Sequence, residues 1–254
     1  MSIDFHIGAH RTGSSAIQSF CVRNREELAA RGVHYPEAPT DKVAMKGETT
    51  AGNANPLYRH IAGERDFPKF WNAHLEALES GRRLLYSAEV FWGKGMSVLP
   101  EITRGAETRI IVYLRAQTDM LVSAYARHVR LKEYPGTLDN LFDKIRAQLH
   151  FEPRLKALES MYAQIAVRPY DKRAFRDNLL MSDLLDQLGL AYDGAFTGAE
   201  TVVNRYETDA QMSADLRQRM IAEYDEENRR ICERYFDGAP WLLPWSEENA
   251  QLSA

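Results

Sequence analysis

The sequence has little cysteine: Cys21 and Cys232 are the two cysteines among 254 residues, and they lie far apart along the chain. It has no CxxC pair, no HExxH sequence and no zinc-finger spacing, so the motifs typical of redox and zinc enzymes are missing. A chain of this length buries enough surface to fold without disulfides. We therefore expect two free thiols in the reducing cytosol, with one disulfide between them as the alternative.

Positive charge and long apolar runs are also scarce. The 32 Lys and Arg residues against 36 Asp and Glu give a net charge of −4, opposite to the balance of most nucleic-acid-binding domains. The most apolar run, residues 110–114, is far shorter than the ~20 residues of a membrane helix. The amino terminus has no basic segment followed by an apolar one. We expect a cytoplasmic protein with no nucleic-acid partner and no membrane span, although a local anion site needs only a few residues.

The apolar patterns that are present alternate between strand and helix. Strands are predicted at residues 2–9, 33–35, 84–88, 109–114 and 165–167. Helices are predicted at residues 13–30, 57–62, 67–80, 118–132, 138–147, 154–164, 182–188 and 213–236, with a long loop or lid at 36–56. This order predicts an α/β fold with a parallel sheet covered on both faces. The chain is expected to form one domain over residues 1–254, with 238–254 as a peripheral C-terminal tail.

A glycine-containing turn joins the first predicted strand to the first helix, with the spacing G-x-x-x-x-G-S-S at residues 8–15. A nucleotide-hydrolase P-loop reads G-x-x-x-x-G-K-[ST], so here a serine stands at the lysine position. Backbone N–H groups at a helix N-terminus bind phosphate oxygens, and an arginine can add a bidentate charged pair. An ordinary turn with a Ser/Thr cap is the alternative. The phosphate-binding residues predicted here are Arg11, Thr12, Gly13, Ser14 and Ser15.

Residues 5–18 resemble the 5′-phosphosulfate loop of sulfotransferases, which in soluble bacterial members reads like HIGxHKTGTTxLQ. The resemblance implies 3′-phosphoadenosine 5′-phosphosulfate (PAPS) as the sulfuryl donor. It also implies a P-loop NTPase-like three-layer fold with a central parallel sheet. Fixed cations and N–H donors can stabilise the leaving oxygens, so no metal is expected. Arg11 replaces the family's usual lysine. Because the pKa of an arginine side chain exceeds ~12, it is a poorer proton donor to a leaving phosphate, which affects the rate more than donor binding.

Residues 115–125 are similar to the 3′-phosphate motif of the same family, RNPxDxxxSxY. Arginine, aspartate, serine and tyrosine are in register, while Ala-Gln stands in place of Asn-Pro at positions 116 and 117. The resemblance puts Arg115 and Ser123 on the 3′-phosphate of the donor. The alternative is an ion pair between Arg115 and Asp119 at the start of a helix.

Weaker features lie downstream of the first motif. Arg127 and Arg130 share a helix face with the motif serine, where they extend the anion site or simply form a solvated face. Tyr170 follows the last predicted strand and resembles an element on the adenine side of the family's donor site. Residues 180–190 and Asn204 resemble further family elements, although packing or capping explains Tyr170 and Asn204 equally well.

Sulfuryl transfer needs a general base that reaches the proton of the acceptor hydroxyl. Glu89 follows the strand at residues 84–88, so in a parallel sheet it lies at the carboxyl edge, where α/β folds bind ligands. This strand end is also similar to the SsE segment of bacterial sulfotransferases. Glu89 is the predicted base and Arg11 the cation at the leaving phosphate, with helix capping by Glu89 as the alternative. His10, inside the loop, is the second candidate base, and His128, on a partly packed helix face, is the third.

The predicted function is transfer of a sulfuryl group from PAPS to an acceptor hydroxyl, and the family analogy favours a glycan or glycolipid acceptor over other small molecules. The acceptor would bind against the loops at residues 36–56 and 134–137. A P-loop nucleotide kinase or hydrolase is the first alternative, although it would want a lysine at position 14 and a Mg²⁺ carboxylate after a later strand. The second is a non-catalytic binding protein, with residues 241–245 as an interface patch instead of packing on the body. The oligomeric state is not predicted.

Overall fold

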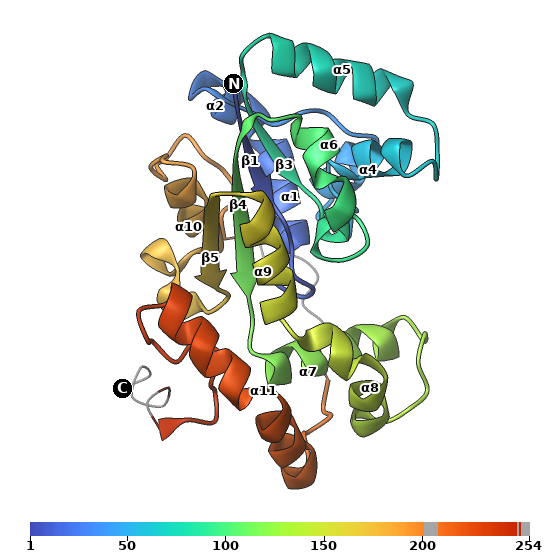
Figure 1. The fold of residues 1–254 in the computed structure, drawn as a ribbon, viewed down its shortest axis with the longest axis vertical. Coiled ribbons are helices and arrows are strands. Elements are labelled where there is room, and N and C mark those ends of the chain that lie inside the picture. Colours follow the sequence, from blue (N-terminus) through green and yellow to red (C-terminus); the bar gives the residue numbers. More distant parts are fainter. Residues whose placement is uncertain (201–207, 248, 250–254) are drawn as a thin grey trace.

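The computed structural model describes residues 1–200, 208–247 and 249. Its sheet is built from strands that all run parallel, in the order β2-β3-β1-β4-β5 (Figure 1). The strands are β1 (Ser2–His6), β2 (Val33–His34), β3 (Arg83–Ser87), β4 (Glu107–Leu114) and β5 (Gln164–Pro169). Because β1 lies between β3 and β4, its carboxyl end meets theirs at the middle of one sheet edge, where α/β folds bind ligands.

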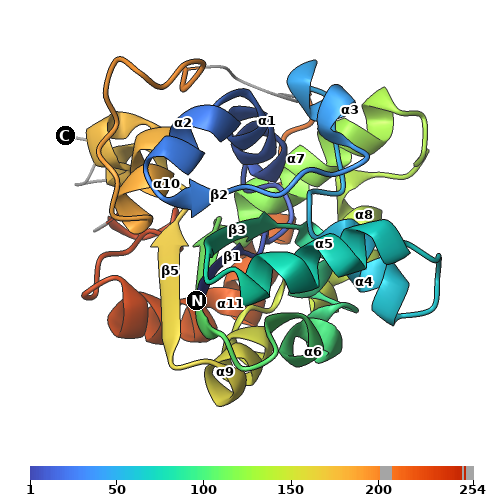
Figure 2. The same cartoon turned by 90° about the horizontal axis from the view of Figure 1, so that it is seen from above.

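Helices cover both faces of this sheet (Figure 2). One face carries α1 (Ser14–Arg23), α2 (Arg25–Ala30) and α10 (Leu180–Gln187). The other carries α4 (Asn55–Ile61), α5 (Pro68–Glu79), α6 (Leu99–Thr103) and α9 (Glu152–Met161). Beyond the carboxyl ends of the strands lie α7 (Gln117–Arg130), α8 (Leu138–Ile145) and α11 (Ala214–Tyr235), and α3 (Asp41–Met45) precedes α4.

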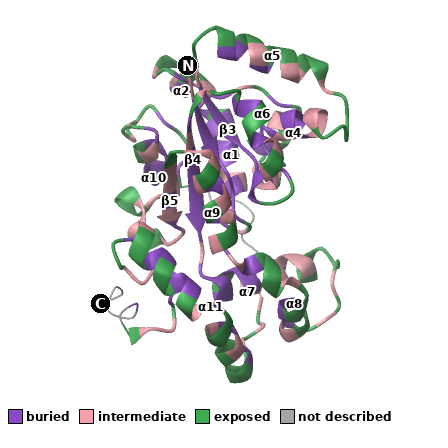
Figure 3. Cartoon of the chain, in the orientation of Figure 1, coloured by how far each residue is buried: buried purple, intermediate pink, exposed green. Residues whose placement is uncertain are grey.

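Two separate apolar cores form because successive side chains of a strand point to opposite faces. Ile110 and Val112 of β4 belong to the core on the α9 side, while Ile111 and Tyr113 belong to the core on the α1 side. Figure 3 shows β1, β3 and β4 largely buried and much of α5 exposed. The predicted α/β fold, with three layers around a central parallel sheet, is confirmed.

The first helix differs from the prediction. The expected helix over residues 13–30 is two helices, α1 and α2, which meet at Asn24. Asn24 is buried, and its side chain donates to the carbonyl oxygens of Phe20 and Thr197, each at 2.9 Å, and accepts from the Thr197 amide at 2.8 Å. These bonds to a distant segment hold Asn24 outside helical geometry, at φ −106° and ψ 23°. Helical periodicity alone gives no sign of such a break.

Two further segments are more ordered than predicted. The expected loop over 36–56 contains α3 and the first residues of α4, whose Pro56 occupies the first turn, a position that tolerates proline. In the expected peripheral tail, Leu242 and Leu243 are buried in the core beside α11. Residues 241–245 therefore pack on the body, as the sequence favoured, and this part of the tail is not peripheral.

Both cysteines, Cys21 and Cys232, are buried and free, which confirms the expected thiols. Within the described ranges, no helix combines the length and the apolar character needed to cross a membrane.

Candidate functional site

A cavity of about 880 Å³ opens at the carboxyl edge of the sheet, between the loop that precedes α1 and the helix α7. All of the predicted site residues except Thr12 line it. These are His10, Arg11, Gly13, Ser14, Ser15, Glu89, Arg115, Ser123 and Tyr170. Residues from four separate segments of the chain therefore meet in one place, as their positions after parallel strands predict.

The loop between β1 and α1 takes a tight path that depends on glycine. Gly13 has φ +78°, and a Cβ there would lie 2.6 Å from Leu180 Cδ2 and 3.0 Å from Tyr170 Cε2. Arg11 is also left-handed, at φ +66°, which non-glycine residues rarely adopt. The first helical bonds run from the Ala16 and Ile17 amides to the Gly13 carbonyl oxygen at 2.9 and 3.0 Å. Gly13, Ser14 and Ser15, which precede Ala16, line the cavity, and the amides at a helix N-terminus are groups that bind phosphate oxygens.

The Ser14 hydroxyl lies in the same loop, buried at the cavity floor. Within the described part of the chain, its Oγ has no hydrogen-bond partner, although buried hydroxyls nearly always have one. Gly8 faces it closely, because a Cβ at Gly8 would come within 2.1 Å of Ser14 Oγ and 3.0 Å of Glu89 Cγ. The unsatisfied hydroxyl is suited to donate to an anion in the cavity.

Thr12 does not line the cavity, although it was predicted to bind phosphate. Its side chain is buried, and its hydroxyl donates to the Ala9 carbonyl oxygen at 2.6 Å. This bond closes the turn from within. The Thr12 hydroxyl therefore stabilises the loop through a backbone bond. A spacing pattern alone does not distinguish such a structural hydroxyl from one that binds a ligand.

The second junction, between β4 and α7, brings another cation to the same cavity. Arg115 Nη1 donates to the Arg11 carbonyl oxygen at 3.4 Å, and Arg11 Nε donates to Ser123 Oγ at 2.9 Å. The alternative ion pair is weak, since Arg115 Nε and Asp119 Oδ2 are 4.0 Å apart and the Asp119 side chain is 57% exposed. The two motifs are thus joined directly, with 112 positions between Arg11 and Ser123 along the chain.

The Tyr170 ring lines the cavity beside Arg115. Arg115 Cζ lies 5.6 Å from the centre of that ring, and Phe175 packs edge-on against it at 5.6 Å. Burial raises the pKa of the Tyr170 hydroxyl, and the nearby Arg115 and Arg11 partly oppose that rise. Tyr170 therefore stays a neutral aromatic surface, suited to pack against a planar ring.

Two of the candidate bases, Glu89 and His10, lie next to each other in the cavity. Glu89 begins a 3₁₀ helix, η1 (Glu89–Trp92), whose N-cap residue is Ala88 and not Glu89. Its Oε2 lies 3.8 Å from His10 Nδ1, and the side chains of Glu89 and His10 are 39% and 62% exposed. Both therefore remain open to a ligand, and the capping alternative for Glu89 is not what the structure shows.

His128 is held differently from the other two candidate bases. Its Nδ1 lies 3.1 Å from Glu133 Oε2, and Arg127 Nη1 donates to the same oxygen at 3.0 Å. Both His128 and Arg127 line the outer cavity, whereas Arg130 is exposed. His128 and Arg127 therefore contact the same carboxylate oxygen of Glu133.

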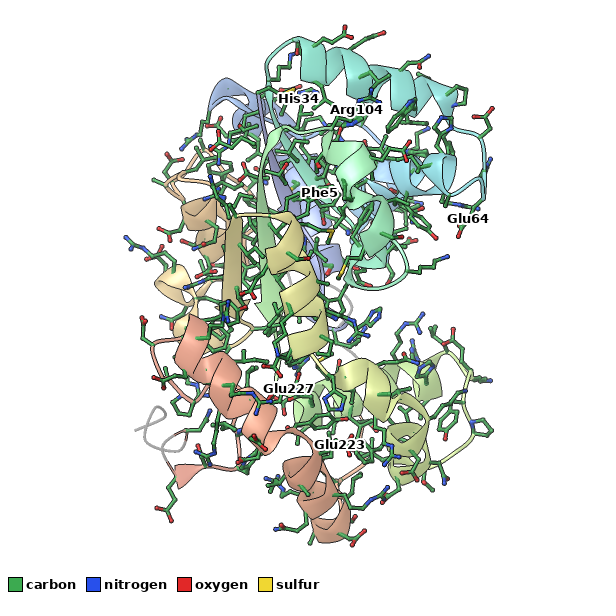
Figure 4. All side chains as sticks on the ribbon, in the orientation of Figure 1. Phe5, His34, Glu64, Arg104, Glu223 and Glu227 are labelled. Atoms are coloured by element: carbon green, nitrogen blue, oxygen red, sulfur yellow. The ribbon has the colours of Figure 1, made fainter. Side chains whose placement is uncertain are left out.

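Sequence reasoning missed several cavity residues, because no motif marks them. They are Thr49, Met120, Val122, Ala124, Ile145, Gln148 and Leu149. The last three come from the end of α8 and from η3 (Arg146–Leu149), and the next residue, His150, is fixed by α11. His150 Nδ1 and Nε2 lie 2.6 and 3.2 Å from carboxylate oxygens of Glu227 and Glu223, both labelled in Figure 4. One weaker match, Asn204, lies outside the described residues.

In the portion of the chain that the structure describes, no group of three or more His, Cys, Asp or Glu side chains is placed to hold a metal ion.

Comparison with known proteins gives one informative result. No family model and no curated protein matches the sequence. Among solved structures, a sulfotransferase from Alicyclobacillus acidocaldarius is similar, with 17% sequence identity and a TM-score of 0.53, over 92% of this chain and 95% of that one. The chain therefore has a sulfotransferase-like fold, of the P-loop-like kind that the sequence predicted.

Proposed function

We propose that this protein is a sulfotransferase that moves a sulfuryl group from PAPS to an acceptor hydroxyl. The observation that carries the proposal is the meeting of two phosphate-binding motifs in one cavity, joined by the bond from Arg11 Nε to Ser123 Oγ at 2.9 Å. The likeness in fold to a bacterial sulfotransferase supports it. A donor with phosphates at both its 5′ and 3′ positions fits two separate cationic loops better than ATP does.

Each part of the donor then has a candidate partner. The amides at the start of α1, the Ser14 hydroxyl and Arg11 would bind the 5′-phosphosulfate. Arg115 and Ser123 would bind the 3′-phosphate, with charge-assisted bonds that are stronger than neutral ones. The adenine ring would pack near Tyr170, whose face already lies against Arg115.

The reaction requires an acceptor oxygen to attack sulfur in line with the departing phosphate oxygen. A new oxygen–sulfur bond forms as the bond from sulfur to the bridging phosphate oxygen breaks, and 3′-phosphoadenosine 5′-phosphate (PAP) leaves with that oxygen. Glu89 takes the proton of the acceptor hydroxyl, since its carboxylate is exposed to the cavity. Arg11 stabilises the charge that develops on the leaving phosphate. The proposed acceptor is a hydroxyl of a glycan or glycolipid, by analogy with the family.

A binding experiment tests the donor. Isothermal titration with PAP, and separately with ATP plus Mg²⁺, should give tight binding of PAP and weak binding of ATP. A sulfate-transfer assay from PAPS to a panel of 4-nitrophenyl glycosides then tests the reaction. Tight binding of ATP alone would favour a nucleotide kinase or hydrolase, and PAP binding without transfer to any acceptor would favour a binding protein.

The assignment of the base is tested by Glu89→Gln, which keeps the shape of the side chain but removes its basicity. We expect transfer to fall by roughly 100-fold or more, while PAP affinity stays within about twofold. Glu101→Gln, at an exposed position of α6, is the matched control and should leave both unchanged. Full transfer by Glu89→Gln would exclude Glu89 as the base, and a parallel loss in His10→Gln would then identify His10.

A further inference from the structure

A chain of hydrogen bonds links four segments of the fold. His6 Nδ1 and Ser87 Oγ are 2.9 Å apart, and Gln18 Nε2 donates to the same oxygen at 3.2 Å. On its other side, Gln18 Oε1 accepts from Thr50 Oγ1 at 2.6 Å. The chain therefore runs from the end of β1, through the end of β3 and the middle of α1, to the segment that precedes α4.

The segment that precedes α4 also contacts β3, through the Asn53 side chain and the backbone of Gly52. The Ser87 amide donates to Asn53 Oδ1 at 2.7 Å, and Asn53 Nδ2 donates to the Leu85 carbonyl oxygen at 3.1 Å. The backbone at Gly52 lies so close to β3 that a Cβ would be 2.0 Å from the Ser87 carbonyl oxygen. Residues 50–53 are therefore bound to β3, the strand that precedes Glu89, through Asn53. Thr50 is their anchor to α1, through Gln18.

Thr49 directly precedes this anchor and lines the cavity with an exposed side chain. The chain next to it is fastened to Ser87, two positions before Glu89. Since the base has to face the acceptor hydroxyl, a residue held beside the base lies on the acceptor side of the cavity. In the proposed function the donor phosphates bind at Arg11 and Arg115.

We propose that Thr49 contacts the acceptor and determines how it binds, and that the bond from Thr50 to Gln18 positions Thr49 for this role. The proposal rests on the proposed sulfotransferase function and extends it to the acceptor. Thr49 would exchange a hydrogen bond with a hydroxyl of the acceptor. Gln18, nearly fully buried at 1% exposure, is a positioning residue, because it acts through Thr50 and does not line the cavity.

The decisive experiment separates acceptor binding from donor binding and from chemistry. Thr50→Val keeps the shape of the side chain and removes the bond to Gln18, together with the longer one from the Gly52 amide at 3.3 Å. With PAPS and a 4-nitrophenyl glycoside that the wild-type chain accepts, we expect the acceptor KM to rise about fivefold or more. The kcat and the Kd for PAP should stay within about twofold. Thr49→Val should raise the acceptor KM in the same way, because it removes the proposed contact itself.

Thr40→Val is the matched control, since Thr40 precedes α3 in the same stretch of chain and its side chain makes no capping bond. It should leave the acceptor KM, the kcat and the Kd for PAP unchanged. Amide hydrogen exchange gives a readout that needs no acceptor: residues 48–54 should exchange about tenfold faster in Thr50→Val than in Thr40→Val.

The outcomes distinguish the two proposals. If the wild-type chain is active and its acceptor KM is unchanged in both Thr49→Val and Thr50→Val, the role of Thr49 is overturned. Unchanged exchange of residues 48–54 in Thr50→Val overturns the role of the Thr50–Gln18 bond. A wild-type chain that transfers to no acceptor at all overturns the sulfotransferase function, and with it the inference that rests on that function.

Discussion

The two junctions that bring arginines to the cavity are built in different ways. The junction between β1 and α1 depends on its backbone: two residues there, Arg11 and Gly13, have positive φ, and the Ser14 hydroxyl is unsatisfied among the described residues. The junction between β4 and α7 contains no glycine and depends on side chains. The first is shaped to receive a ligand, whereas the second is anchored to the rest of the protein.

The anchor of the second junction is Gln117, the first residue of α7. Its side-chain amide exchanges two hydrogen bonds with Asn228 of α11, at 3.0 and 2.9 Å, and both residues are fully buried. Asn228 also donates to the Leu242 carbonyl oxygen at 2.9 Å. Gln117 stands where the family motif has proline, so the departure from the motif has a structural explanation: the turn is fixed by α11 instead of by a proline ring.

The largest effect should come from the first junction. Arg11→Ala removes the cation that we propose for the leaving phosphate, and we expect sulfuryl transfer to fall about 1000-fold or below detection. Arg11→Lys should retain much of the rate, because the lysine also carries a positive charge and can protonate the leaving group. The measurement is the steady-state rate of PAP release. A rate for Arg11→Ala within tenfold of the wild type would contradict the assignment of this junction to the reacting phosphate.

A change at the second junction should lower the affinity for PAP through its 3′-phosphate, and not through its 5′-phosphate. For Arg115→Ala we expect the Kd for PAP to rise about 30-fold, as the loss of a charged hydrogen bond of ~2 kcal/mol requires. The Kd for AMP, which has no 3′-phosphate, should change by less than about twofold. Titration of both nucleotides into both proteins checks this. Equal losses for PAP and AMP would remove the distinction between the two junctions.

The anchor itself can be tested by stability. Gln117→Leu leaves the Asn228 oxygen without its donor, and the free energy of unfolding should fall by ~2.5 kcal/mol. Gln218→Leu, at an exposed position of α11, is the control and should change it by less than ~0.5 kcal/mol. Urea denaturation measures both. If the two variants were equally stable, the Gln117–Asn228 bonds would contribute nothing to the free energy of unfolding. The difference between the junctions would then be one of shape alone.

The last effect concerns pH and the first junction. Burial lowers the pKa of His6 to about 4, and the nearby Glu89 partly opposes this. The folded state therefore keeps His6 neutral while the unfolded state binds a proton as the pH falls below ~6.5. Stability should decrease as the pH falls from ~6.5 towards 4, by ~2 kcal/mol at pH 5. In His6→Gln the difference in unfolding free energy between pH 7 and pH 5 should shrink by that amount. An unchanged difference would show that His6 is not the titrating group.

The sequence predicted the strands better than the helices. The β-branched run of β4 and the alternation in β1 follow from local patterns, so their existence and their parallel packing were predictable. The break at Asn24 was not, because it depends on hydrogen bonds to Thr197, which is 173 positions away. The sequence also predicted a loop at residues 36–56, where the structure has helices and fixed contacts. These contacts depend on partners on β3 and α1, which bind Asn53 and Thr50.

The sequence by itself determined which kinds of side chain follow each strand, because a motif records residue types and their spacing. It thereby placed Arg11, Arg115 and Glu89 at one edge of a parallel sheet. Only the tertiary structure decided what each side chain does there: Thr12 turns inward to Ala9, Gln117 pairs with Asn228, and Thr49 reaches the cavity. The physical reason is that a hydrogen bond depends on distance and direction in space, and these bonds join residues whose separation in sequence ranges from 3 to 111 positions.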